Sequence, residues 1–280
     1  MIKYNIEKPD NGIKDNIQEK IDNLNKPKGS LGRLEDLAMQ ICLIQQTLQP
    51  SLSHPSHLLL GADHGIEHEG VSLSPRDVTW QQMINFTHGG GGVNMFCRQH
   101  GFDLKIVDMG VDHDLSSYKE IRNMKIAPGT QDFLFSAAMS EKQMETALKN
   151  GTTLVDECFE NGCNVICIGE MGIGNTSPSS IWLHLLGKVA LEECVGAGSG
   201  VEGNQLNHKF KVLSMAVKKF KEIFDTEDTL NIIRYFGGFE MVGAIGAMLR
   251  AAEKKMIILV DGFIMSACML AANKLYPAVL

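Results

Sequence analysis

The chain has 280 residues, of which 44% are hydrophobic and 21% charged, so it can bury one large core or a main domain with a small appendage. Its formal net charge of -7 argues against nucleic acid or an anionic membrane surface as the main partner. No apolar run is as long as a membrane span, and the first residues do not resemble a signal peptide, so we expect a cytoplasmic protein without a membrane partner.

The first predicted elements are two helices. Residues 10–25 place isoleucine or leucine every three to four positions on a polar background, which predicts an amphipathic helix. A basic, glycine-containing turn at 26–33 leads into a second helix of about 34–48. Ser30 as a helix cap explains this turn, although its lysines and arginine are also close enough together to face an anion.

Five short apolar runs then predict strands, and each is expected to end on glycine or aspartate. The predicted strands are 57–62, 104–109, 165–168, 230–235 and 256–260. The run 230–235 is also compatible with a short helix, and 114–139 is expected to be a loop with a possible hairpin. The predicted helices are 75–87, 93–97, 141–161, 178–193, 206–224, 239–253 and 263–274.

Alternation of strands and helices is typical of an α/β fold with a parallel sheet covered by helices on both faces. Because crossovers are right-handed, the carboxyl ends of all the strands lie at one edge, where ligands bind. The Gly, Asp and Glu residues that follow the predicted strands should therefore converge. This convergence predicts a ligand site at that edge.

The seven cysteines are odd in number and scattered along mostly apolar stretches. A disulfide framework is typical of small secreted chains with an even number of cysteines. We therefore expect reduced thiols that pack as small, buried hydrophobic side chains.

The stretch 164–180 combines a strand, a glycine-rich turn and the start of a helix with hydroxyl caps. Glycines allow close approach of the backbone to a ligand, and the N–H groups at a helix start attract an anion. Tight turns also use glycine for steric reasons alone. Glu170, a carboxylate at the mouth of this turn, favours the ligand-binding interpretation, because it would repel phosphate unless it had another task.

Two further groups have both a structural and a functional interpretation. Lys209 lies on a basic helix and is ordinarily expected to be solvated, unless the loop Gly196–Gly200 folds it inward. His64 and His68 have carboxylates beside them, but the motif H-E-x-x-H is absent and Gly65 interrupts a helix, so we expect no metal. Asp63 and His64 are expected to orient each other or a loop at the sheet edge.

At this point six segments resemble the nicotinate-nucleotide:dimethylbenzimidazole phosphoribosyltransferase family. They are KPKGSLGRLEDLA (26–38), ADHGIEHEGVSLSP (62–75), GEMGIGNTSPSS (169–180), VGAGSG (195–200) with Lys209, GGFEMVGAIGAML (237–249) and LVDGF (259–263). The resemblance implies transfer of ribose 5-phosphate from nicotinate mononucleotide to a benzimidazole, which yields nicotinate and α-ribazole 5′-phosphate for the lower ligand of cobalamin. It also implies a homodimer without a metal or cofactor.

The resemblance implies a Rossmann-like, doubly wound, mostly parallel sheet with flanking helices and a small helical subdomain. Residues 1–35 would form the N-terminal part of that subdomain, and residues 36–280 the nucleotide-binding domain. The phosphate would bind the turn and the loop that precedes Lys209, at Gly172, Gly174, Asn175, Thr176, Gly198 and Lys209. Glu170 would stabilise oxocarbenium-like charge on the ribose. The base pocket and remaining contacts would come from Ser74, Gln81, Gln82, Met171, Phe239, Asp63, His64 and Asp261.

The family's catalytic base is a glutamate beyond the stretch that ends this sequence, Tyr276 to Leu280. Without that glutamate and the C-terminal helices of the small domain, we expect a chain that binds nucleotide but turns over poorly. The alternative is a non-catalytic protein of the same fold that binds a nucleotide or an aromatic base. A third interpretation is a different glycosyl-transferring enzyme with a changed base pocket at 74–86.

Overall fold

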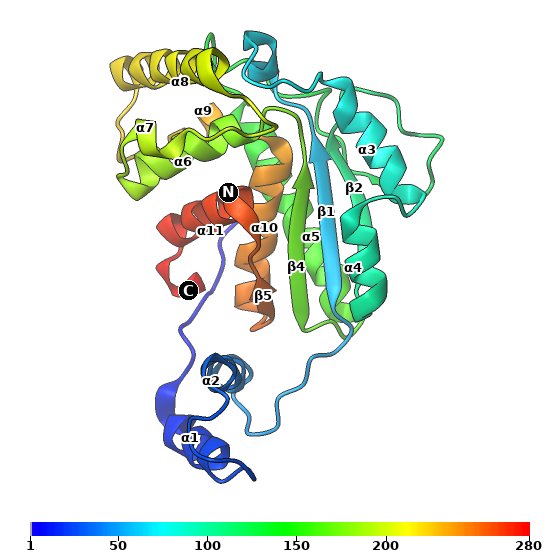
Figure 1. Cartoon of the computed structure of the whole chain (residues 1–280), viewed down its shortest axis with the longest axis vertical. Coiled ribbons are helices and arrows are strands. Elements are labelled where there is room, and N and C mark those ends of the chain that lie inside the picture. Colours follow the sequence, from blue (N-terminus) through cyan, green and yellow to red (C-terminus); the bar gives the residue numbers. More distant parts are fainter. Residues whose placement is uncertain (1) are drawn as a thin grey trace.

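The computed structural model describes residues 2–280. It contains a five-stranded sheet in which every neighbouring pair is parallel and the order is β3-β2-β1-β4-β5 (Figure 1). The strands are β1 (Ser56–Ala62), β2 (Asp103–Gly110), β3 (Ile121–Asn123), β4 (Val165–Met171) and β5 (Ile257–Leu259). The predicted parallel sheet is confirmed.

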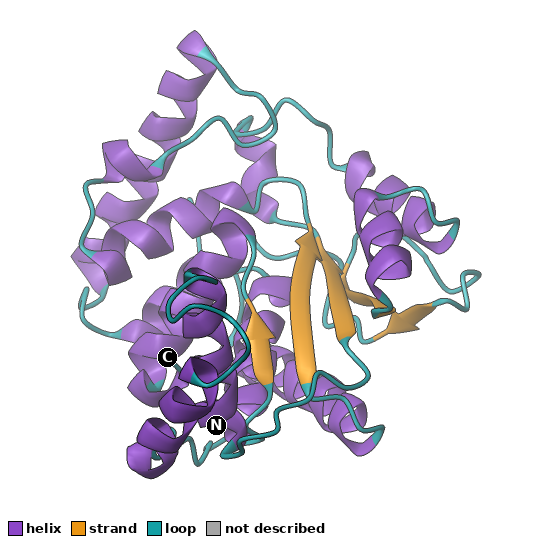
Figure 2. Ribbon diagram, turned by 60° about the horizontal axis from the view of Figure 1, so that its bottom comes forward, coloured by secondary structure: helices purple, strands orange, loops and turns teal. Residues whose placement is uncertain are grey.

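Helices cover both faces of the sheet (Figure 2). They are α1 (Lys14–Asp22), α2 (Arg33–Gln45), α3 (Asp77–Thr87), α4 (Gly92–His100), α5 (Glu141–Glu160), α6 (Thr176–Gly187), α7 (Leu191–Cys194), α8 (Gly203–Ile223), α9 (Thr229–Phe236), α10 (Phe239–Glu253) and α11 (Gly262–Leu275). Short 3-10 helices occur at η1 (Asn11–Ile13), η2 (Gly65–Glu69) and η3 (Pro277–Val279).

The leucines of β1 supply a core on each face, because successive side chains of a strand point to opposite sides. Leu58 and Leu60 are fully buried in the larger core, which also contains side chains of α5 and α10. Leu59 packs in a second core with Met83 of α3. The two cores hold the sheet rigidly between its helix layers.

The chain reverses direction across the sheet next to β1. It moves outward from β1 through β2 to β3, and it then returns to the other side of β1 with β4. In doubly wound folds, ligands bind outside the carboxyl ends of the strands at such a reversal. Here the reversal lies between β1 and β4, whose ends lead to Asp63 and Glu170.

The N-terminal helices α1 and α2 form a small unit with its own core. Ile17 and Ile21 of α1 pack against Cys42 of α2, and Figure 1 shows this pair below the sheet. The predicted boundary between residues 35 and 36 falls inside α2. The division into two domains stays a prediction.

Two segments differ from the sequence-based expectation. No hairpin forms within 114–139; instead β3 pairs in parallel with β2 at the edge of the sheet. The run 230–235, predicted as a strand, is instead helical as part of α9, so the strand prediction is wrong and the alternative of a short helix is confirmed. Asp228 caps this helix by accepting a hydrogen bond from the Asn231 N–H at 3.0 Å, and the apolar residues of α9 fall on one buried face.

The helix expected at 178–193 begins at Thr176 and breaks after Gly187, where Lys188 is left-handed. A short helix, α7, follows.

All seven cysteines are free thiols, six of them buried and Cys167 half-buried. No helix within residues 2–280 has the length and apolar character needed to cross a bilayer.

Candidate active site

Asp63 and His64 follow β1 directly and are almost completely buried, each 1% exposed. Asp63 Oδ2 accepts a hydrogen bond from the Asp112 N–H at 2.8 Å, so it fixes the loop that follows β2. His64 instead contacts Glu240 at the start of α10, with Nε2 2.7 Å from Glu240 Oε1. The expectation that Asp63 orients a loop is confirmed, whereas the two residues do not orient each other by a hydrogen bond.

The His64–Glu240 pair is enclosed by two glycine-containing turns. A side chain at Gly172 would come within 3.0 Å of His64 Nε2, and one at Gly238 within 2.2 Å of His64 Cε1. Burial works against the charged imidazolium, but the charge of Glu240 and its hydrogen bond outweigh burial and raise the pKa of His64. Glu240 Oε2 is buried without a hydrogen-bond partner among the described residues.

Glu170 lies at the end of β4, beside this pair. Its Oε2 atom accepts a hydrogen bond from Asn175 Nδ2, so the glycine-rich turn closes on the carboxylate. Burial, reinforced by the negative charge of Glu240, raises the pKa of Glu170 to about 7 against the opposing effects of Asn175 and His64. The carboxyl group of Glu170 therefore titrates near neutrality. Asn175 precedes α6 without the expected side-chain cap bond.

Lys209 is buried with 0% exposure, so the solvated interpretation is wrong. Its Nζ atom donates to Thr176 Oγ1 at 2.8 Å and to the Gly196 carbonyl at 3.2 Å. No carboxylate within residues 2–280 forms an ion pair with it. Burial lowers the pKa of Lys209 to about 8. A buried ammonium without a counter-ion is suited to an anionic ligand.

Gly198 makes room for this lysine. Its φ is +57°, and a Cβ atom would lie 2.8 Å from Thr176 Oγ1 and 3.1 Å from Lys209 Nζ. The loop Gly196–Gly200 therefore folds Lys209 inward. This is the exception that the sequence analysis allowed to a solvated lysine.

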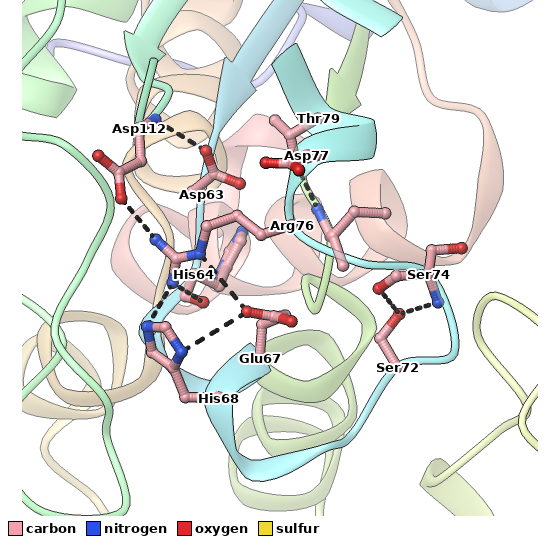
Figure 3. Close-up of polar contacts among 12 residues, drawn as sticks. Asp63, His64, Glu67, His68, Ser72, Ser74, Arg76, Asp77, Thr79 and Asp112 are labelled. Atoms are coloured by element: carbon pink, nitrogen blue, oxygen red, sulfur yellow. Dashed lines mark hydrogen bonds and ion pairs between the residues drawn. The ribbon is translucent and has the colours of Figure 1, made fainter. Parts of the chain in front are cut away.

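Arg76 joins the loops around the site, and sequence analysis did not identify it (Figure 3). Its guanidinium donates to Asp112 Oδ2 at 3.1 Å and to the His64 carbonyl at 3.3 Å. It also lies 3.0 Å from His68 Nε2 through Nη2, so His64 and His68 face different partners. The only sequence signal was the position of Arg76 immediately after Ser74-Pro75, at the start of α3.

Segments 71–87 and 195–200 also meet at this edge. Ser72 and Ser199 share a hydrogen bond of 2.8 Å, and the Ile173 N–H donates to Thr79 Oγ1 at 3.1 Å. These bonds place α3, which carries Gln81 and Gln82, beside the glycine-rich turn. Ser74 is half-buried in the same loop, where its carbonyl accepts from the Ser72 hydroxyl.

Three further predicted site residues, Phe239, Met171 and Asp261, take no part in these hydrogen bonds. Phe239 is 1% exposed and packs in the larger core, and Met171 packs against the second core. Asp261 is exposed after the edge strand β5, and its carboxylate makes no cap bond to α11. The predicted convergence therefore holds for β1, β2 and β4 but does not extend to Asp261, because β5 ends level with Cys167 in the middle of β4.

The site thus combines the buried Lys209 and a glycine-rich turn with the carboxylate of Glu170, whose pKa is raised to about 7. The lysine side suits a phosphate, and the carboxylate side suits positive charge that develops on a neighbouring carbon. The two sides are joined by the turn that runs from Glu170 through Asn175 to Thr176. Such an arrangement fits a substrate with an anionic end and a cationic reacting centre.

Comparison with known proteins supports the same conclusion. A sequence model of a phosphoribosyltransferase family matches residues 6–280. The nicotinate-nucleotide–dimethylbenzimidazole phosphoribosyltransferase of Phocaeicola vulgatus is 57% identical over 280 residues, covering 100% of this chain and 80% of that protein. The protein of that name from Dechloromonas aromatica is 42% identical, with 100% and 80% coverage.

A solved structure agrees in fold. The crystal structure of CobT from Thermus thermophilus matches with a TM-score of 0.90 and 29% sequence identity, over 95% of this chain and 79% of that one. This likeness supports the α/β, Rossmann-like architecture. The chain therefore belongs to the nicotinate-nucleotide–dimethylbenzimidazole phosphoribosyltransferase family.

Proposed function

We propose that this protein transfers ribose 5-phosphate from nicotinate mononucleotide to 5,6-dimethylbenzimidazole or a related base. The products are nicotinate and α-ribazole 5′-phosphate, which enters synthesis of the lower ligand of cobalamin. The family membership supports the reaction, and the observation that carries it here is the buried, unpaired ammonium of Lys209 beside Thr176.

The phosphate of the nucleotide binds at Lys209, Thr176 and the turn that contains Gly172 and Gly174. A phosphate oxygen replaces the weaker partners of the lysine, and the glycines leave the backbone open to approach. Gly198 keeps the space above the ammonium free. The phosphate thereby anchors the ribose next to Glu170.

The reaction breaks the bond between the anomeric carbon and the pyridinium nitrogen. The bonding electrons stay on that nitrogen, which becomes the neutral ring nitrogen of nicotinate. The ionised carboxylate of Glu170 stabilises the positive charge that develops on the ribose carbon. The unprotonated ring nitrogen of the benzimidazole forms the new bond from the opposite face, which inverts the anomeric centre, and the proton on the other ring nitrogen then passes to water. The enzyme's main contribution is orientation and charge, because the leaving group is already good.

The benzimidazole is proposed to bind along the segment that carries Ser74, Gln81 and Gln82. The Ser72–Ser199 and Ile173–Thr79 hydrogen bonds support this position, because they hold the segment against the phosphate turn. Met171 forms an apolar wall, whereas Phe239 is buried in the larger core and contributes by packing rather than as an exposed wall.

We also propose the homodimer and cytoplasmic location that the resemblance implies. Analytical ultracentrifugation of the purified chain tests the first, since the dimer predicts twice the mass of the 30.8 kDa chain. No cofactor or metal enters the proposed reaction.

The reaction is tested by mixing the purified chain with nicotinate mononucleotide and dimethylbenzimidazole, and following nicotinate release by chromatography. Release should depend on both substrates and should fall in Glu170→Gln, while Glu192→Gln on the exposed side of α7 should leave it unchanged. Absence of release with intact, saturable nucleotide binding would instead favour the binding protein of the same fold.

A further inference from the structure

The end of α5 brings two cysteines together at the edge of the sheet where the strands begin. The helix ends in a Schellman motif: the Cys163 N–H donates to the Cys158 carbonyl at 3.0 Å, and the Gly162 N–H donates to the Phe159 carbonyl at 2.9 Å. Gly162 takes the left-handed conformation with φ +82°. In this motif, the residues at the positions of Cys158 and Cys163 contact each other through their side chains.

Ordinarily two apolar side chains occupy these positions. Here both are thiols, and the Cys158 thiol hydrogen bonds to the Cys163 sulfur. A disulfide joins residues whose Cα atoms are roughly 4.4–6.8 Å apart, and the side-chain hydrogen bond already brings the two thiols into direct contact. The pair can therefore be bridged without refolding of the helix end.

A cavity of about 320 Å³ gives access to the pair. Both thiols line it, although their residues are only 1% and 2% exposed. Its rim is formed by exposed residues such as His54, Asp103 and Asn161. The opening admits a small reagent, whereas the burial of the sulfurs disfavours a protein-sized partner.

We propose that Cys158 and Cys163 are a dithiol modification site, which a small hydroperoxide converts to an intramolecular disulfide. The Cys163 thiolate attacks a peroxide oxygen, the O–O bond breaks, and the sulfenic acid of Cys163 forms while water or an alcohol leaves. The Cys158 sulfur then attacks Cys163, the S–S bond forms, and the S–O bond breaks with loss of water. The hydroperoxide gains the two electrons that the thiols lose.

The surroundings assign the attacking role to Cys163. The hydrogen bond from Cys158, assisted by Ser56, lowers the pKa of Cys163 to about 6 against the effect of burial. The same hydrogen bond, with burial, raises the pKa of Cys158. The backbone of Val165, whose carbonyl lies 3.1 Å from Cys163 Sγ, contributes to the same lowering. The other charged groups that line the cavity are Lys105 and Asp103, which form an ion pair of 2.8 Å, and His54.

The proposal is tested by treating the whole protein with hydrogen peroxide at pH 7, blocking free thiols, and mapping peptides by mass spectrometry. The peptide that contains both cysteines should lose the mass of two hydrogen atoms. This should occur about tenfold or more faster than any oxidation of Cys42, a control thiol that is more exposed, 5% against 2%, but whose pKa is raised.

Two variants separate the roles of the thiols. Cys158→Ser should leave a sulfenic acid on Cys163 that dimedone traps, and Cys163→Ser should leave Cys158 unmodified. Equal oxidation of Cys42, or identical behaviour of the two variants, would overturn the proposal. The comparison with Cys42 within the unmodified protein keeps the test valid if a variant fails to fold.

Discussion

At the scale of single residues, two ionisable groups define the site, the half-buried Glu170 and the buried Lys209. Glu170 and Lys209 lie on opposite sides of Asn175 and Thr176, and burial moves the pKa of each toward neutrality. Among residues 2–280 neither group forms an ion pair, and their hydrogen-bond partners Asn175 and Thr176 are neutral. Their charges are therefore available to a ligand.

The pH dependence of the reaction tests the role of Glu170. Its pKa is raised from 4.5 to about 7, and only the ionised carboxylate stabilises positive charge on the ribose. The value of kcat/KM for nicotinate release, which reports the pKa values of the free enzyme, should therefore rise as pH increases through about 7. In Glu170→Gln the rise should be absent from the residual rate, and a variant profile that keeps the same inflection would assign it to another group.

The stability of the free protein tests the burial of Lys209. Its pKa is lowered from 10.5 in the unfolded chain to about 8, so between these values the unfolded chain binds more protons and stability rises with pH. Lys209→Met removes this contribution. Thermal unfolding without anions at pH 7 and pH 9 should show the unmodified protein gaining stability relative to Lys209→Met as pH rises. The exposed control Lys211→Met should keep a constant difference from the unmodified protein.

At the scale of elements, loops from distant parts of the chain are locked together by buried contacts. The turn after β4 touches His64 after β1, and His64 holds Glu240 of α10. The loop before α8 curls over Thr176 at the start of α6. The geometry of the site therefore depends on backbone space as much as on side chains.

Gly198→Ala tests that dependence in the loop before α8. The added methyl group would approach Thr176 Oγ1 and Lys209 Nζ, so nucleotide binding should weaken by about tenfold or more. Gly203→Ala is the matched control, because Gly203 has a similar φ of +53° but nothing within 4 Å of the added atom. Equal losses in both variants, measured by calorimetric titration, would assign the effect to backbone strain rather than to the contact with Lys209.

The His64–Glu240 pair is the second element-scale contact. Glu240→Leu leaves a buried histidine without its partner and should destabilise the protein by about 3–5 kcal/mol. The double variant His64→Leu with Glu240→Leu should recover part of that loss, because two apolar groups replace the ion pair. Urea unfolding of the two single variants and the double variant measures this coupling. Additive losses would show that the two side chains do not act as a pair.

At the scale of the whole molecule, the alternation of strands and helices, together with the glycines that follow the strands, was sufficient to predict the parallel sheet. The same pattern predicted the edge of the sheet at which a ligand binds. The strands that sequence located correctly, such as β1 and β4, have strongly apolar runs between clear turns. The edge strand β3 has three residues and two exposed side chains, so it carries almost no hydrophobic pattern. The run that became α9 contains β-branched residues, and packing rather than local propensity made it helical.

Sequence predicted the site residues whose neighbours along the chain are unusual. It did not predict the residues whose role depends on tertiary packing. Glu170 follows a strand and a glycine, which marks it from sequence alone. Glu240 stands 176 positions from His64, and Arg76 donates hydrogen bonds to the separate loops that follow β1 and β2. Only the folded chain brings these partners together.

In the proposed function, Lys209 recognises the phosphate of the nucleotide. The most direct measurement compares binding of nicotinate mononucleotide and of nicotinate riboside, which lacks the phosphate, to the unmodified protein and to Lys209→Met by isothermal titration calorimetry. We predict that the unmodified protein prefers the mononucleotide by about 10- to 100-fold, as expected for charge-assisted hydrogen bonds, and that Lys209→Met loses most of this preference. An equal preference in both proteins would contradict the assignment and place the phosphate elsewhere.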